Sequence, residues 1–435
     1  MRPLRLFFLP QRTPRVAQSK EGYINKKLNF YLNKELIHKS LLSLKAYIEK
    51  EEYKGWDPYD GLNSKVFQSL PFLKNWDLAR LTWIQLFKRN PLNLRRLFLV
   101  PKEYNPKGIA LLLSGYCNLL KYYRLTKNTY YGDDPELLQK INILSEKLIS
   151  LRSPFTTKNA ACWGYIFDWQ SKAFFLPSNT PTIVATSFAI ESLLQTYSLT
   201  KNEICLQNAL SAADFIKFDL NRIRKGDNFM FSYSPLDHRA VYNATLLATK
   251  SLSHLHKFNK DPEFKELAFT SARAVCNLQN LDGSFPHSDQ VGNKWRDNFH
   301  TAFKLESLAY YQKYCSENTF NVNIEKGFDY WFNNFFDYDS GLSYYYEHNS
   351  KLIDLHCAAQ AIPTFCALNK FKEHQLFLSK VLVWVINNMQ HPSGYFYYQK
   401  RGKRINKIPY MRWPNAWMFY GISYYLLADA ENEKD

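Results

Sequence analysis

Aspartate and histidine residues occur in close pairs in the C-terminal half of the chain, at spacings that suit proton transfer. Asp297 and His300 are three residues apart, so they share one face if the segment is helical. Asp354 and His356 are two apart and cannot both face one way on a regular helix, but with Asp354 as a cap His356 can still project inward. Histidine moves protons near neutral pH, so both pairs are candidate acid–base groups. The alternative for Asp297 is an N-cap followed by a satisfied histidine one turn later.

These residue types fit two kinds of sugar chemistry. An inverting glycoside hydrolase needs two carboxylates about 6.5–9.5 Å apart, and the candidates are Asp168, Asp237, Asp297 and Asp354. A lyase or C5-epimerase acting on a uronic acid needs a base such as His or Tyr, and a cation that stabilises the carboxylate as the α-proton leaves. The second list matches the sequence better: His238, His300, His356, Tyr410, Arg296 and Arg412. The candidate catalytic residues are therefore His300, His356, His238, Asp297, Asp354 and Tyr410.

Aromatic and polar side chains near these groups are candidate substrate-binding residues. Arg412 beside Trp413 suits bidentate binding of a carboxylate with stacking on the indole, although a structural ion pair would use the same arginine. The candidates are Trp163, Asp168, Trp169, Asp237, Arg239, Tyr242, Asn243, Trp295, Arg296, Tyr346, Arg412, Trp413 and Asn415.

The elements that must position these residues are helices, because apolar residues recur with a 3.6-residue period along almost the whole chain. The runs form pairs: 34–50 with 107–126, 134–152 with 180–199, 201–219 with 238–256, 260–280 with 297–315, 320–336 with 352–368, and 370–390 with 414–428. The second members start about 55 to 75 residues apart, which indicates a repeat. They are rich in small and apolar residues, as buried helices are, whereas the first members are amphipathic. The pattern predicts an inner ring of helices wrapped by an outer ring.

Two short stretches mark the turns of this repeat. Gln279 is followed four residues later by Gly283 and then by Phe285, and Gln390 is followed in the same way by Gly394 and Phe396. Glycine at such a place ends a helix, and the aromatic loops that follow alternate enough to form short strand pairs. If all inner helices start at one end of the ring, their first turns converge on one funnel, where the positive helix ends favour an anionic substrate.

The Gln-x-x-x-Gly-x-aromatic element resembles the repeat of terpenoid cyclases and of protein prenyltransferase β-subunits. The paired helices also resemble the α/α toroids of uronyl hydrolases, polysaccharide lyases and sugar epimerases. The stretches Gly55–Leu62, Trp163–Trp169 and Arg412–Trp417 are most similar to toroid proteins encoded in bacterial exopolysaccharide and capsule clusters. These resemblances imply an all-α (α/α)6 toroid with short β-hairpins in the loops at one end, and a role in surface polysaccharide production.

The resemblance to prenyltransferases raises the question of a zinc site, which in that family uses Asp, Cys and a distant His. Asp354, Cys357 and His300 supply those types, but the spacing differs from that family's Asp-x-Cys and Cys357 lies among alanines. We therefore expect neither a metal nor another cofactor. The chain also lacks the cyclases' Asp-x-Asp-Asp acid motif, which weakens isoprenoid chemistry.

The bulk composition is consistent with a globular protein that meets an anion. The 435 residues carry a formal net charge of +17, without the arginine-rich helix or zinc finger that would indicate nucleic acid. Seven scattered cysteines favour reduced thiols and a cytoplasmic location. We expect one toroid domain over residues 31–435, a helical insertion at about 55–100, and an N-terminal arm at 1–30 whose order is open.

The sequence thus predicts a cytoplasmic carbohydrate-active protein that binds an acidic oligosaccharide and modifies it by elimination, epimerisation or hydrolysis. An isoprenoid-handling enzyme and a non-catalytic glycan-binding protein are the alternatives. A peripheral contact with membrane-associated polysaccharide machinery is a further expectation.

Overall fold

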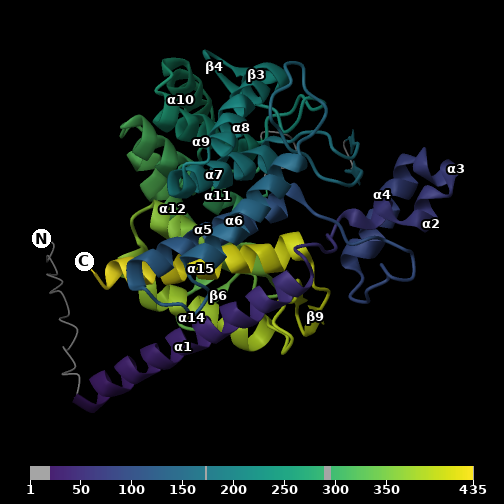
Figure 1. The fold of residues 1–435 in the computed structure, drawn as a ribbon. Coiled ribbons are helices and arrows are strands. Elements are labelled where there is room, and N and C mark those ends of the chain that lie inside the picture. Colours follow the sequence, from purple (N-terminus) through teal and green to yellow (C-terminus); the bar gives the residue numbers. More distant parts are fainter. Residues whose placement is uncertain (1–19, 172–173, 289–294, 435) are drawn as a thin grey trace, which may run out of the picture.

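Six helices form a closed inner ring in the computed structural model, which describes residues 20–171, 174–288 and 295–434 (Figure 1). They are α5 (Pro106–Thr126), α7 (Ile183–Thr200), α9 (Tyr242–Asn259), α11 (Asn298–Cys315), α13 (Leu355–Ala367) and α15 (Ala416–Asn432). Each packs against the next, and α15 packs against α5, so the ring closes. The predicted all-α (α/α)6 toroid is confirmed.

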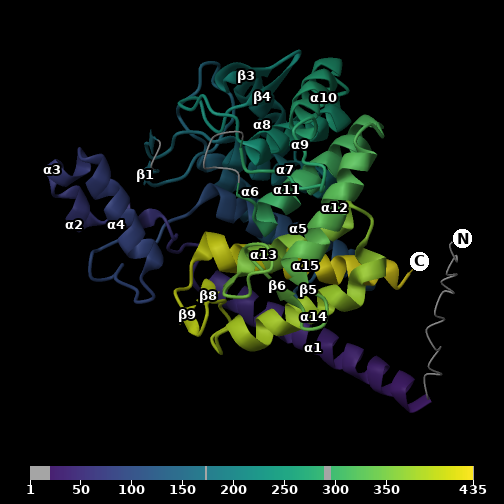
Figure 2. The same cartoon turned by 180° about the vertical axis from the view of Figure 1, so that it is seen from behind.

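The outer ring consists of α1 (Lys20–Lys50), α6 (Asp134–Ser150), α8 (Glu203–Asp214), α10 (Pro262–Cys276), α12 (Asn321–Phe335) and α14 (Phe371–Met389). Helix α1 lies against α14 and α15, as the view from behind shows (Figure 2). It begins at Lys20 rather than near residue 34, so it takes in the second part of the predicted arm; residues 1–19 of that arm lie outside the described residues.

The pairing of helices differs from the predicted one. From α6 to α14, each outer helix packs more closely on the inner helix that precedes it than on the one that follows. The physical reason is the length of the connections: α5, α7, α9 and α11 each end in one residue with a left-handed backbone, at Lys127, Lys201, Lys260 and Ser316, and the next outer helix begins soon after. The connection from an outer helix to the next inner helix is a long loop.

The long loops carry the predicted short strands. β1 (Trp169–Gln170) pairs with β2 (Phe175–Leu176), β3 (Arg222–Lys225) with β4 (Asn228–Phe231), and β5 (Phe336–Asp337) with β6 (Leu342–Ser343). β7 (Leu352–Asp354), β8 (Gln399–Arg401) and β9 (Arg404–Asn406) form a three-stranded sheet. All pairs are antiparallel.

The repeated glutamine and glycine bind each outer helix to its neighbour. The Gln279 amide donates to the Gly283 carbonyl at 2.8 Å and to the Asn323 carbonyl of α12 at 2.9 Å. The Gln390 amide donates likewise to Gly394 at 2.9 Å and to Ser40 of α1 at 3.1 Å. Gly394 has a φ of +96°, and a Cβ there would lie 2.1 Å from the Ser43 carbonyl oxygen, so only glycine fits.

Charged residues at equivalent places of three inner helices meet in the middle of the ring. Lys250 of α9 donates to Glu191 of α7 at 2.6 Å and to Glu306 of α11 at 2.5 Å, and all three side chains are nearly fully buried. The Gln360 amide of α13 donates to the other Glu306 oxygen. Glu191, Lys250 and Glu306 each begin a three-residue segment that continues with Ser and Leu, so the repeat places the three charged residues at equivalent positions.

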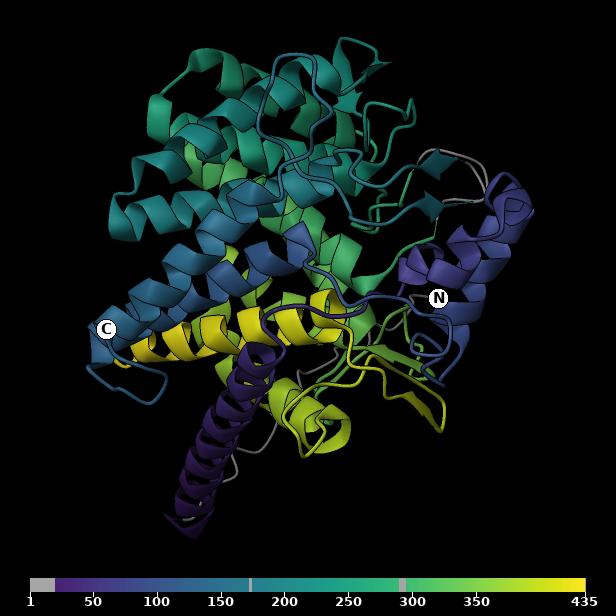
Figure 3. The same ribbon diagram turned by 45° about the vertical axis from the view of Figure 1, so that its right-hand side comes forward.

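The predicted helical insertion stands at one side of the ring (Figures 1 and 3). It contains η1 (Asp60–Asn63), α2 (Lys65–Gln68), α3 (Pro71–Lys74) and α4 (Asp77–Arg89). The buried Arg95 guanidinium donates to Asp60 at 2.8 Å and to the Asp57 carbonyl at 2.7 Å, which fixes the start of the insertion to its end. No helix in the described part of the chain is both long and apolar enough to span a membrane.

Candidate active site

A cavity of about 500 Å³ opens at the end of the ring where the inner helices begin. Each inner helix or the turn before it contributes to the lining: Lys107, Val184, Asn243, Phe299, His300, Phe303, His356, Arg412 and Trp413. The loops add mostly aromatic side chains, among them Tyr165, Phe167, Trp169, Phe174, Tyr233, Trp295, Tyr345 and Tyr346. A cavity of this size suits a small ligand with a few fixed polar contacts.

His300 is held at this cavity by a carboxylate. Asp297 caps α11: one oxygen accepts the His300 backbone N–H at 2.8 Å, and the other lies 2.7 Å from Nδ1 of the same residue. The Asp297 side chain is fully buried, whereas that of His300 is 20% exposed. A carboxylate on Nδ1 favours the tautomer with its proton there, which leaves Nε2 to accept a proton. The predicted pair is therefore both a cap and an oriented imidazole.

His356 lies deeper and has no polar partner. Its ring lies 4.1 Å from Phe299 and 4.1 Å from Trp417, centroid to centroid, and both ring nitrogens are buried without a hydrogen bond among the described residues. Burial lowers the pKa of His356 well below 6.5, with a further contribution from the charge of Lys107. A neutral imidazole has one N–H donor and one acceptor nitrogen, so both nitrogens of His356 are free to hydrogen-bond a ligand.

Asp354 takes a structural position rather than a cavity-lining one. It is fully buried, and one oxygen accepts from the His356 backbone N–H and from Trp413 Nε1, each at 2.9 Å. Its other oxygen accepts from Gln399. Asp354 therefore fixes both the start of α13 and the indole of Trp413, which lines the cavity.

Arg412 is paired with an acid that the sequence analysis did not select. Its guanidinium donates through Nε and Nη2 to the two Asp57 oxygens, the second at 2.8 Å. Both side chains are buried, and the guanidinium lies 5.0 Å from the ring centroids of Tyr165 and Trp413. The structural ion pair that was the alternative for Arg412 is present, with the arginine also at the cavity wall.

The opposite wall carries Asp237, Arg239 and Asn243. Arg239 donates to Asp237 at 2.9 Å, and its guanidinium lies 4.5 Å from the Phe174 ring centroid. Asp237 is the single carboxylate residue among the described lining residues. The Asn243 side-chain oxygen is buried without a partner in the described part of the chain, and so is Nδ1 of His287. Both lie at the cavity, where a ligand could satisfy them.

His287 lies flat against Trp295, with 4.0 Å between centroids and 15° between planes. The His287 ring is also 5.2 Å from that of His300. Burial lowers the pKa of His287 to about 2, so this ring stays neutral. Trp295 and His287 together form one wall beside the Asp297–His300 pair.

Several candidates lie outside the cavity because the fold uses them elsewhere. Trp163 is in the core, where its Nε1 donates to the Leu148 carbonyl at 2.7 Å. Asp168 caps a turn by accepting from the Ser178 N–H at 2.7 Å. Arg296 forms a bidentate pair with Glu347, and its Nη1 donates to Ser284 at 3.2 Å.

The remaining candidates outside the lining are His238, Tyr242, Tyr410 and Asn415. His238 is exposed, and Tyr242 is a buried residue at the start of α9. Tyr410 is fully buried against Arg95, whose guanidinium lies 4.7 Å from its ring centroid. Asn415 accepts from the Phe396 N–H at 2.8 Å and donates to the Tyr410 carbonyl at 2.9 Å, so it fixes the loop before α15.

Sequence reasoning did not select four residues that matter to the cavity. Tyr59 and Lys88 come from the insertion, and Lys88 donates to the Tyr59 hydroxyl at 2.7 Å. Asp57 lies behind Arg412, and Lys107 lies in the first turn of α5. The sequence offered one signal for these residues: Lys107 lies at the start of an inner helix, as the selected residues Asn243 and His300 do.

No three His, Cys, Asp or Glu side chains gather into a metal-binding group anywhere in the described ranges. Cys357, considered above with Asp354 and His300, is fully buried in α13. Burial raises the pKa of its thiol well above the usual value.

Several solved structures have a fold similar to that of this chain. No family model matches the sequence, and no curated protein does. Among solved structures, cellobiose 2-epimerase from Bacillus thermoamylovorans is 13% identical, with a TM-score of 0.56 over 76% of this chain and 88% of that one. The α-mannanase of glycoside hydrolase family 76 from Bacteroides thetaiotaomicron is 11% identical, with a TM-score of 0.55 over 76% and 86%.

A third similar structure is an unsaturated glucuronyl hydrolase specific for heparin, which is 14% identical, with a TM-score of 0.52 over 74% of this chain and 87% of that one. At such identities the likeness shows the α/α-toroid fold alone. The resemblances to terpenoid cyclases and to toroids of exopolysaccharide clusters stay predictions.

Proposed function

We propose that this protein is a carbohydrate-active enzyme that moves a proton on an acidic sugar, as epimerases and lyases do. The observation that carries the proposal is the position of two histidines at one cavity, one held by a carboxylate and the other with both nitrogens free. The ring of Phe299 lies between them, with its centroid 4.1 Å from that of each histidine. A ligand in the cavity can therefore meet both imidazoles.

The proposed chemistry assigns the two histidines different roles. His300 takes a proton from a sugar carbon at Nε2, and Asp297 stabilises the imidazolium that forms. His356, as a neutral imidazole, donates a hydrogen bond to the oxygen on which charge develops, and the proton taken up by His300 is returned to the sugar or to the leaving oxygen. The aromatic walls formed by Trp295, Trp413 and Tyr346 stack against the sugar ring and exclude water.

Hydrolysis is the weaker candidate, because it needs two carboxylates that face each other across the cavity. Asp237 carries the one carboxylate among the described lining residues, and Arg239 already pairs with it. An isoprenoid-handling role fits less well, since the lining mixes His, Lys, Arg and Asp with aromatic rings. Three of the similar structures are named for sugar enzymes, which supports the choice of substrate class.

The cellular setting is part of the proposal. We place the protein in the cytoplasm, in surface polysaccharide production, with contact to membrane-associated machinery at the periphery. The +17 net charge supports an acidic oligosaccharide as the partner.

The direct test is the exchange of a carbon-bound sugar proton with D₂O, followed by NMR. A panel of uronate and neutral disaccharides is incubated with the wild type and with His300→Asn, His356→Asn and His238→Asn. We expect exchange in the wild type and a loss of at least ~100-fold in the first two variants. His238→Asn is the control, because this histidine is exposed and lies outside the cavity lining.

Two results would contradict the proposal. One is undiminished exchange in both cavity variants, and the other is an equal loss in His238→Asn. Release of new reducing ends without exchange would indicate hydrolysis instead.

A further inference from the structure

Lys107 is a buried amine at the cavity, without a partner of opposite charge in the described part of the chain. It is the second residue of α5 and only 3% exposed. Its Nζ lies 4.4 Å from the Phe188 ring centroid, 5.3 Å from that of Phe303 and 5.2 Å from that of Trp417. No hydrogen bond or ion pair joins Nζ to any residue that the structure describes.

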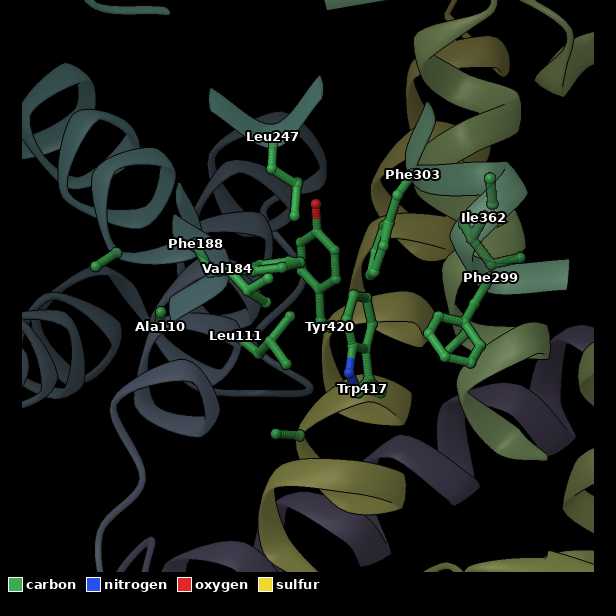
Figure 4. Close-up of a cluster of buried hydrophobic side chains, with 14 of the residues drawn as sticks. Ala110, Leu111, Val184, Phe188, Leu247, Phe299, Phe303, Ile362, Trp417 and Tyr420 are labelled. Atoms are coloured by element: carbon green, nitrogen blue, oxygen red, sulfur yellow. The ribbon is translucent and has the colours of Figure 1, made fainter. Parts of the chain in front are cut away.

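The three rings around the Lys107 amine, which we call the aromatic floor, contact one another (Figure 4), and Phe303 is the one of the three that also lines the cavity. They come from three different inner helices, α7, α11 and α15. The nearest acid that acts on the amine is Asp57, which is already paired with Arg412. With the rings on one side of the amine, a further polar partner reaches Nζ from the cavity. Lys107 is among the residues that line the cavity.

The other cations near the cavity already have partners. Arg412 is paired with Asp57, Arg239 with Asp237, and Lys88 donates to the Tyr59 hydroxyl. Arg296, which the sequence analysis also considered, is paired with Glu347 outside the lining. A carboxylate that bound at one of these arginines would have to share it with an acid of the protein. Lys107 carries no such competitor.

An unpaired cation in an apolar site is unfavourable unless a ligand supplies the opposite charge. Burial lowers the pKa of Lys107 well below 10.5, and the nearby charge of Arg412 lowers it further. The faces of the aromatic floor favour the charged amine but do not accept strong hydrogen bonds. A carboxylate from the ligand would supply both the charge and the acceptors.

We propose that Lys107 binds the carboxylate of a uronic acid residue that enters the cavity first. The inference rests on the proposed function and adds the orientation of the substrate. Lys107 and His356 contact the same two rings, those of Phe303 and Trp417. A carboxylate on Lys107 therefore brings C5, the carbon that bears it, close to the imidazole of His356.

The test compares pairs of sugars that differ only in the carboxylate. The methyl glycosides of glucuronic, galacturonic and mannuronic acid are titrated against those of glucose, galactose and mannose, with the tryptophan fluorescence of the cavity as readout. The variants are Lys107→Met and Lys107→Arg, with Lys121→Met as the matched control. Lys121 is a partly buried lysine on the same helix, outside the cavity lining, and should contribute little to the preference.

We expect the wild type to prefer at least one uronide over its neutral partner by ~10- to 100-fold, the range of a charge-assisted hydrogen bond. Lys107→Met should abolish this preference while leaving the neutral sugar's affinity in place, and Lys107→Arg should restore part of it. Lys121→Met should keep the preference of the wild type. Thermal unfolding should find Lys107→Met at least as stable as the wild type, because the variant removes a buried, unpaired amine.

A preference that survives in Lys107→Met would overturn the inference, and so would equal binding of uronides and neutral sugars by the wild type. In both cases the proposed function would stand. Binding of none of the six sugars by the wild type would overturn the inference and count against the proposed function as well.

Discussion

Asp57 forms a buried ion pair with Arg412 behind the cavity wall, and replacing Asp57 tests how much this pairing contributes to stability. In Asp57→Asn the side chain keeps its size but loses its charge. One oxygen remains for Arg412, while the new amide group faces an N–H donor of the guanidinium in place of the second oxygen. The Arg412 side chain is 4% exposed, so water cannot replace the lost partner.

The expected cost follows from the burial of both partners, 4% and 6% exposed. Removing one partner of a buried pair costs about 3–5 kcal/mol, because the other charge stays buried and unpaired. Arg412→Met should cost a similar amount, since it leaves the Asp57 carboxylate with only the Tyr59 N–H at 3.1 Å. The double variant should cost clearly less than the sum, because no unpaired charge remains.

The assay is urea unfolding of the wild type, the two single variants and the double variant at pH 7, followed by circular dichroism. Glu263→Gln is the matched control: it removes the partner of Lys217 in a pair with one half-exposed member, where screening keeps the cost under about 1 kcal/mol. The reasoning is refuted if Asp57→Asn costs no more than Glu263→Gln. It also fails if the two single costs simply add in the double variant.

Three further predictions concern other buried features. Gly402→Ala should lower the free energy of unfolding by about 1 kcal/mol, and Gly394→Ala should lower it by clearly more. Both glycines have a positive φ, but only at Gly394 would a Cβ press onto a backbone carbonyl. Urea unfolding of both variants checks this, and equal losses would contradict it. Lys250→Met should destabilise by about 3–5 kcal/mol, since it leaves two buried carboxylates side by side, and the loss should shrink at acid pH, where the carboxylates can protonate; a loss independent of pH would argue against charge as its cause. Burial lowers the pKa of His254 well below 6.5, so His254 takes up a proton on unfolding and the protein loses stability as the pH drops below about 6.5. In His254→Phe this loss of stability should be smaller, by up to about 1.4 kcal/mol per pH unit. An unchanged pH dependence of the free energy of unfolding would contradict the buried, neutral state of His254.

The architecture was predictable because its signals are local and repeated. The 3.6-residue period, the recurring Gln and Gly, and the three-residue segments that begin at Glu191, Lys250 and Glu306 each report on one helix or one turn. The repeat then fixes how the units pack, since equivalent residues meet at one level of the ring. The predicted pairing of outer with inner helices was wrong, but each predicted run does contain a helix.

The candidate site was predictable only where a residue's own neighbours in sequence position it. Asp297 and His300 are one turn apart, and the sequence predicts both the cap and the shared face. Arg412 and Asp57 are 355 residues apart, so nothing local relates them. Tyr410 was selected because it is polar and stands two residues before Arg412. In the structure it packs in the core against Arg95, which the local sequence does not indicate.

The contact between Gln390 and α1 also bears on how the ring is made during synthesis. Helix α1 packs on α14 and α15, and both Gln390 and Gly394 fit against its backbone. Helix α1 is synthesised long before α14 and α15. The side of α1 that packs on them therefore has no partner until the helices between them in the sequence have been made. In the folded ring α14 packs against both α13 and α1. The outer ring can therefore close only after α14, one of the last helices to be synthesised, has been made.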